Sequence, residues 1–146
     1  MSQRSKPIIL RLSRVLLCLG VGFSAVSIYQ TLVLAFDPAF QAPALPLGPR
    51  HTNYHAFRGF TLAFGTVVIM LFVMFQPAQR RQPVLWTIML LSALFYYGGW
   101  WLPWPLLGLH TPNLAAGVDH GLATFFSLAG ILLARGEFNV RDCQER

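Results

Sequence analysis

The side chains best suited to chemistry lie in two short stretches of this sequence. His51, His55 and Arg58 are spaced i, i+4 and i+7, so on a helix they would share one face. Asp119 and His120 are adjacent, and on a helix that begins near residue 112 they would lie roughly 10 Å from its start. Carboxylates and imidazoles bind ligands and transfer protons. The two stretches would therefore form one site if they lie at the same depth.

Asp119 falls inside an apolar run, where an acid costs about 2.5–3.5 kcal/mol on insertion scales and usually faces a partner. Arg58 is the only cation expected at that depth on the same side. We therefore predict an Arg58–Asp119 ion pair between the second and fourth apolar runs. The pair would either fix the helix register or belong to a proton or ligand site facing the periplasm. Removing one partner should cost more than removing both.

The histidines allow a second hypothesis, a transition-metal or haem b site. His51 and His55 could direct two rings at one ligand, and His110, His120 or Asp119 would complete three or four ligands. A haem held by two histidines would need rings on different helices, with His55 and His120 the best pair. The HxxxH spacing alone is a weak motif, because the acid typical of hydrolytic zinc helices is missing. We expect no bound cofactor, with at most one haem per chain as the alternative.

The elements that must position these residues are transmembrane helices. The chain has 146 residues, of which 11% are charged, against about 25% in soluble domains. About 20 apolar residues cross a bilayer as a helix, and four segments qualify. The sequence therefore predicts an all-α protein with one domain over residues 1–146, a four-helix transmembrane bundle. Its spans are Val15–Phe36, Phe57–Phe75, Val84–Leu102 and Leu114–Leu133.

The segments outside the spans also contain residues that predict local structure. The loop Asp37–Tyr54 holds four prolines, which forbid a continuous helix, and we expect it to lie against the outer membrane surface. Thr111-Pro112 is typical of an N-cap and first turn, here of the last helix. The tail Gly136–Arg146 is expected to be a frayed helix end.

Charge decides the expected orientation. Nine of the eleven Lys and Arg flank the spans on one side, and only Arg50 and Arg58 lie on the other. The positive-inside rule then places both termini in the cytoplasm of a bacterial-type inner membrane. An aromatic belt at the outer end of the third span agrees with this orientation: Tyr96, Tyr97, Trp100, Trp101 and Trp104.

Small and hydroxyl-bearing residues mark the faces expected to pack. Gly117 and Gly121 form a GxxxG motif that permits close backbone approach, within the bundle or between two copies. Polar stripes run along the first and fourth spans, where such side chains usually hydrogen-bond across helices. A hydrated pathway between these two spans is the alternative. The stripe residues are Ser24, Ser27 and Thr31 on the first span, and His120, Thr124 and Ser127 on the fourth.

The overall plan resembles the DUF4345 type of small four-helix bacterial inner-membrane proteins. The residues that carry the likeness are the proline-bearing loop Pro38–Pro49, the step Arg58-Gly59 into the second span, and the basic turn Arg80-Arg81. The likeness covers about the first two-thirds of the chain. It implies a membrane protein without assigned chemistry.

No catalytic motif accompanies these features, since phosphate-cradling loops, nucleophile elbows and dinucleotide fingerprints are missing from the sequence. The net charge of +6 comes from cations at the ends of the spans, which suit lipid headgroups and not nucleic acid. We therefore expect a non-enzymatic accessory or envelope protein in contact with the lipid bilayer, with a membrane-protein partner or a homo-oligomer. The alternatives are a metal or haem redox protein and a small proton-coupled carrier that acts as an oligomer through Asp119.

Overall fold

The structure, a computed structural model, describes residues 6–41, 48 and 50–139, and within these residues every regular element is helical. Four helices are long and apolar enough to cross a membrane. The predicted all-α, four-helix architecture is therefore confirmed. The long helices are α1 (Lys6–Phe36), α2 (His51–Met74), α3 (Pro83–Trp101) and α5 (Leu114–Leu133); the short ones are the 3-10 turn η1 (Ala78–Arg80), α4 (Pro103–Leu107) and α6 (Arg135–Phe138).

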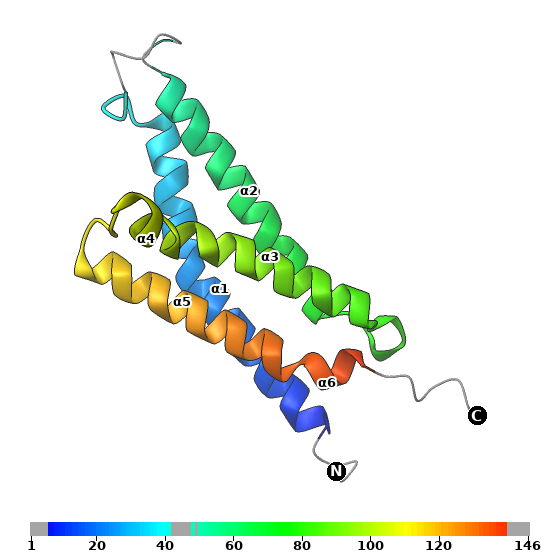
Figure 1. The fold of residues 1–146 in the computed structure, drawn as a ribbon. Coiled ribbons are helices and arrows are strands. Elements are labelled where there is room, and N and C mark those ends of the chain that lie inside the picture. The colour runs from blue at the N-terminus through cyan, green and yellow to red at the C-terminus, as the bar shows by residue number, and fades with distance from the viewer. Residues whose placement is uncertain (1–5, 42–47, 49, 140–146) are drawn as a thin grey trace.

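The four long helices form a ring in the order α1–α2–α3–α5, so that α2 and α5 occupy opposite corners. We call the end that holds the start of α2, α4 and the start of α5 the histidine end, and the opposite end the arginine end. Toward the histidine end, the α1–α2 pair diverges from the α3–α5 pair (Figure 1). The bundle is therefore tight at the arginine end and open at the histidine end.

Large apolar side chains cover the outside of this ring. Phe95 is 81% exposed and Leu114 is 85% exposed, and many other Leu, Val, Ile and Phe side chains of the long helices point outward. Soluble monomers rarely expose contiguous apolar patches beyond a few hundred Å², whereas lipid tails solvate such a surface. The four helices and their apolar outer surface together indicate a protein that spans the membrane several times.

The closest packing joins the first and last long helices. A Cβ atom added at Gly20 of α1 would lie 2.6 Å from the backbone nitrogen of Ser127 and 2.8 Å from the carbonyl oxygen of Ala123. One added at Gly130 of α5 would lie 2.6 Å from the carbonyl oxygen of Ser13. The two helices thus meet backbone to backbone through two buried stripes of the same spacing. The stripes are Ser13, Leu17, Gly20 and Ser24 on α1, and Ala123, Ser127 and Gly130 on α5 with Ala134 at its C-cap.

The helix α5 covers the predicted residues and α3 is shifted by one residue, whereas α1 and α2 begin earlier than predicted, α2 at His51 within the predicted loop Asp37–Tyr54. The cap of α5 differs from the prediction: the side chain of Asn113 accepts a hydrogen bond of 2.8 Å from the backbone N–H of Ala116. The prediction of Thr111-Pro112 as cap and first turn was therefore wrong. Asparagine is the better cap because its carbonyl oxygen reaches the first free N–H groups of the helix.

The loop between α1 and α2 is described only in part, since residues 42–47 and 49 lie outside the described residues. Its described part is tied to the end of α1 by the amide of Asn53, which donates to the carbonyl oxygens of Leu34 (3.0 Å) and Asp37 (2.8 Å). Each of these carbonyl oxygens also accepts a backbone N–H of the turn that follows α1, so Asn53 provides a second donor to both. The start of α2 is thereby fixed beside the end of α1.

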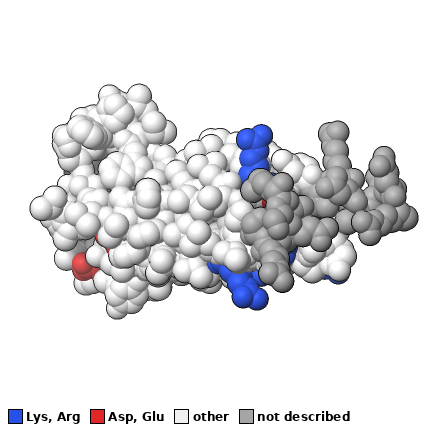
Figure 2. All heavy atoms as spheres, turned by 90° about the horizontal axis from the view of Figure 1, so that it is seen from below, with Lys and Arg blue, Asp and Glu red and all other residues white. Residues whose placement is uncertain are grey.

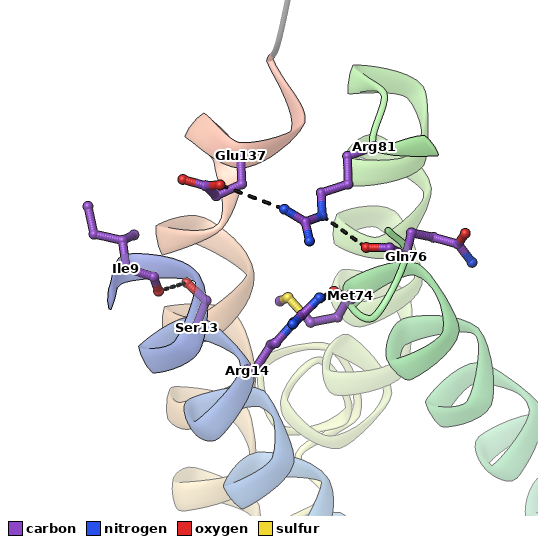
Figure 3. A network of polar contacts seen from close by, with 7 residues as sticks. All are labelled: Ile9, Ser13, Arg14, Met74, Gln76, Arg81 and Glu137. Atoms are coloured by element: carbon purple, nitrogen blue, oxygen red, sulfur yellow. Dashed lines mark hydrogen bonds and ion pairs between the residues drawn. The ribbon is translucent and has the colours of Figure 1, made fainter. Parts of the chain in front are cut away.

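At the arginine end, two guanidinium groups cover the carboxyl end of α2 (Figure 3). The Nε and Nη2 atoms of Arg14 lie 3.4 and 3.5 Å from the carbonyl oxygen of Met74, and Nε of Arg81 donates to the carbonyl oxygen of Gln76 at 3.0 Å. Cations at this position also interact favourably with the helix dipole. Arg14 and Arg81 therefore close the bundle at this end.

Glu137 of α6 completes this closure, because its carboxylate lies 3.7 Å from Nη1 of Arg81. Burial and the nearby charge of Arg14 lower the pKa of Arg81, and Glu137 acts in the opposite direction. Phe138 is fully buried beside this pair. The prediction of a frayed tail was thus wrong for residues 136–139, which pack onto the bundle, while residues 140–146 lie outside the described residues.

Candidate functional site: two hollow spaces flanking α1

A chain of hydroxyl groups crosses the interior of the ring. The hydroxyl oxygen of Tyr97 on α3 lies 3.1 Å from Oγ of Ser24 on α1 and 2.6 Å from Oγ of Ser127 on α5. Ser24 also donates to the carbonyl oxygen of Gly20 at 3.0 Å. All three hydroxyl-bearing side chains are buried. This chain of hydroxyl groups joins three helices. Tyr97 forms the link between α1 and α5, although it was predicted only as part of the aromatic belt.

An aromatic wall stands between this chain and the histidine end. The rings of Trp100 and His120 stack at a centroid distance of 4.1 Å and an angle of 19°, and Tyr96 packs on Trp100 at 4.9 Å. Among the described residues, Nδ1 of His120 and the hydroxyl of Tyr96 are buried without a hydrogen-bond partner. Each such atom costs about 1–3 kcal/mol unless something pairs with it. The wall therefore contains two polar groups with unused bonding capacity.

The first hollow space is a cleft of about 610 Å³ between α1, α2 and α3. Its walls are mainly small or hydroxyl-bearing residues, with aromatic rings at the α3 side. The cleft lies where the α1–α2 pair diverges from α3 (Figure 1). Among the residues that line it are Ser27, Thr31, Gly59, Ala63, Thr66, Ser92, Phe95, Tyr96, Gly99 and Trp100.

The second hollow space, of about 330 Å³, lies between α1 and α5 at the histidine end. It is lined by Asp119 and His120 of α5 and by Gln30 of α1, together with apolar side chains. It is separated from the cleft by α1 and by the Trp100–His120 stack, whose two rings line different spaces. We call it the Asp119 pocket.

Arg58 and Asp119 do not form the predicted ion pair. The only ion pair within the described residues is Arg81–Glu137, and the side chain of Arg58 is exposed. The reason is the order of the helices: α2 and α5 stand at opposite corners of the ring, so groups at equal depth remain apart. Each of the two charges is therefore left without an opposite charge from the described chain.

The four histidines are likewise not brought into one group. His51 and His55 contact each other, with their Nε2 atoms 2.8 Å apart, and His110 packs against Trp104. His120 instead stacks on Trp100 in the ring interior. Within the described residues no three His, Cys, Asp or Glu side chains are placed to hold a metal ion. The His55–His120 pair proposed for haem lies on α2 and α5, which stand at opposite corners of the ring, so the two imidazole rings do not face each other across a helix pair.

The residues predicted to pack the helices together lie in different environments. Gly117 and Gly121 are not used for close approach within the bundle, since a Cβ at Gly121 would meet nothing within 4 Å and one at Gly117 would meet only the Thr111 hydroxyl. Thr124 accepts a hydrogen bond of 2.9 Å from Nε1 of Trp101, which links α5 to α3. Ser27 lines the cleft.

The signal for the contact actually used was present in the sequence. It is the matched spacing of small residues around Gly20 on α1 and Gly130 on α5. Glu137 carried no comparable signal, since a single helical turn beyond the last span is too short for a pattern.

This arrangement is suited to binding. Within the described residues no serine or cysteine side chain is hydrogen-bonded to a histidine or a carboxylate, the contact that activates a nucleophile. What the chain does offer is two separate spaces with polar atoms in an apolar setting. No protein-family profile, curated protein sequence or solved structure matches this chain.

Proposed function

We propose that this protein is an accessory subunit of the bacterial-type inner membrane, with no catalytic centre of its own, and that it binds one transmembrane helix of a partner protein. The observation that carries the proposal is the cleft between α1, α2 and α3. A bundle that only had to be stable would close this space by packing α3 against α1 along its whole length. The helices instead diverge there (Figure 1).

The lining of the cleft favours a helix as its occupant. Gly59, Ala63 and Gly99 permit close backbone approach, and Ser27, Thr31 and Thr66 can hydrogen-bond to another helix. Small residues and hydroxyls are the groups that transmembrane helices use for association, because apolar burial gives no driving force in lipid. A lipid tail would gain nothing from the hydroxyls.

Arg58 adds charge complementarity. It lies one helical turn before Leu62, which lines the cleft, and no acid of the described chain pairs with it. An unpaired cation in a span is costly and usually has a partner. The proposed partner helix therefore carries an acidic residue near the histidine end.

The proposed orientation places the arginine end in the cytoplasm. On the face shown in Figure 2, the blue Lys and Arg atoms lie toward the right, and a red acidic side chain is visible near the left end, the side on which α4 lies in Figure 1. Under the positive-inside rule the cation-rich end lies in the cytoplasm, which gives a topology with both termini cytoplasmic. Reporter fusions after residue 79 should then show cytoplasmic signals, and fusions after residue 109 periplasmic ones.

A photo-crosslinking experiment tests the proposed occupant. A photoreactive amino acid at Phe95, which lines the cleft, should capture a partner whose captured peptide is a transmembrane helix with an acid. Gly99→Leu should abolish this product, because Gly99 lines the cleft and a Cβ atom added there meets no atom of the chain within 4 Å. Gly22→Leu is the matched control, since Gly22 also faces open space but does not line the cleft.

Three results would overturn the proposal. One is capture of a second copy of this chain alone, and another is capture of lipid alone. The third is equal loss of the product in Gly99→Leu and Gly22→Leu. Neutralising the acid of the captured helix should reduce the product in the wild type and have little further effect in Arg58→Gln.

A further inference from the structure

The Asp119 pocket holds a carboxylate without a cation. Its charged and polar lining consists of Asp119, His120, Gln30 and Asn113, and no Lys or Arg is among the residues that line it. The other acid described at this end, Asp37, differs in this respect, because it shares its pocket with Arg50. Asp119 thus has no Lys or Arg in its pocket, whereas Asp37 has Arg50.

A carboxylate in a membrane span needs an opposite charge nearby. Asp119 lies five residues after the start of α5, about 7.5 Å along the helix axis. The N–H group of Ala116 in the first turn donates to the side chain of Asn113 and is therefore not free for another acceptor. No Lys or Arg of the described chain supplies the opposite charge to Asp119, which leaves that role to a ligand.

We propose that the Asp119 pocket binds a protonated primary amine. The carboxylate of Asp119 would accept a charge-assisted hydrogen bond from the ammonium group, and the amide oxygen of Gln30 would accept a second. Val26, Ala115 and Ala116 would contact the carbon chain next to the nitrogen. The amine is either free or the headgroup of an aminophospholipid, since both present the same ammonium group.

The composition of the pocket favours an organic cation over a metal ion. Calcium and magnesium take six or more oxygen ligands. The pocket supplies one carboxylate and the amide of Gln30, whereas the side-chain oxygen of Asn113 is already used as a helix cap. No group of three metal-binding side chains exists among the described residues. An alkylammonium ion needs fewer polar partners and gains from the apolar walls.

This inference does not depend on the proposed helix partner, because the pocket and the cleft lie on different sides of α1. Two arms test it on the full-length protein. In the first, the protein is released from bilayers of equal phosphatidylethanolamine and phosphatidylglycerol, and retained lipid is counted by native mass spectrometry. In the second, propylamine is titrated by calorimetry into protein held in a choline-headgroup detergent, with sodium chloride at equal ionic strength as reference.

Asp119→Asn keeps the shape of the side chain and removes its charge. It should therefore weaken binding at least about tenfold in each experiment in which the wild type binds. Asp37→Asn is the matched control and should bind as the wild type does. Binding in the first arm alone identifies the lipid headgroup, and binding in the second shows that free amines enter. The proposal is overturned if neither arm depends on Asp119, if sodium competes as well as propylamine, or if Asp37→Asn has the same effect.

Discussion

Replacing Gly20 by alanine tests how closely α1 and α5 pack. The new methyl group would lie 2.6 Å from the backbone nitrogen of Ser127, whereas ordinary contacts begin at 3.4 Å. The helices would have to separate by about 0.8 Å, the difference between these two distances, because a backbone atom cannot rotate away. Overpacking generally lowers the free energy of unfolding by about 1–3 kcal/mol. Because the obstacle here is a backbone atom, we expect a loss of about 2–3 kcal/mol. Against this loss, alanine stabilises the helix by about 0.5–1 kcal/mol relative to glycine, because its helix propensity is higher.

The matched control is Gly22→Ala, two residues along the same helix, where a Cβ meets nothing within 4 Å. Only the propensity gain applies there, so the two variants should differ by about 2–3 kcal/mol in the free energy of unfolding. Equilibrium unfolding in mixed micelles of rising SDS content, followed by tryptophan fluorescence, measures this difference. Equal stability of the two variants would refute the close approach of α1 and α5.

Two further substitutions test the polar contacts. Tyr97→Phe removes both hydrogen bonds to Ser24 and Ser127, each worth about 0.6–1.7 kcal/mol in a membrane, and should lower the free energy of unfolding by about 1–3 kcal/mol in the same assay; an unchanged value would contradict the buried chain. Glu137→Gln removes the carboxylate that lies 3.7 Å from Nη1 of Arg81 and leaves that guanidinium, whose side chain is only 9% exposed, without its counter-charge, so it should destabilise by about 1–3 kcal/mol. If that loss simply adds to the loss from Arg81→Gln in the double variant, the two side chains are not coupled.

The helices themselves were predictable from the sequence, because a bilayer imposes one rule that composition reveals directly. A run of about 20 apolar residues must be helical to pair its own backbone groups. Leu114–Leu133 was predicted to the residue for this reason. The helix α3 is shifted by one residue from its predicted span, whereas α1 and α2 begin earlier than predicted, at Lys6 and His51, because each includes turns with polar or charged side chains.

The candidate site was less predictable, since depth can be counted along a sequence and the order of helices around a ring cannot. Arg58 and Asp119 were placed at comparable depth, yet they occupy opposite corners. Tyr97 could not be assigned to the interior, because a tyrosine near the end of a span suits the interface equally well. The close approach at Gly20 and Gly130 was not predicted, although the small residues around them repeat with the same period on both helices.

The backbone contact between α1 and α5 has a consequence for how the protein is made. It joins the first of the four long helices to the last, so the Gly20 face of α1 stays without its partner until α5 has been synthesised. A chain cut short before α5 would present that face to neighbouring proteins in the bilayer. Docking of α5 is therefore the step that closes the four-helix ring, and a membrane protease that recognises unpaired helix faces would distinguish closed rings from open ones.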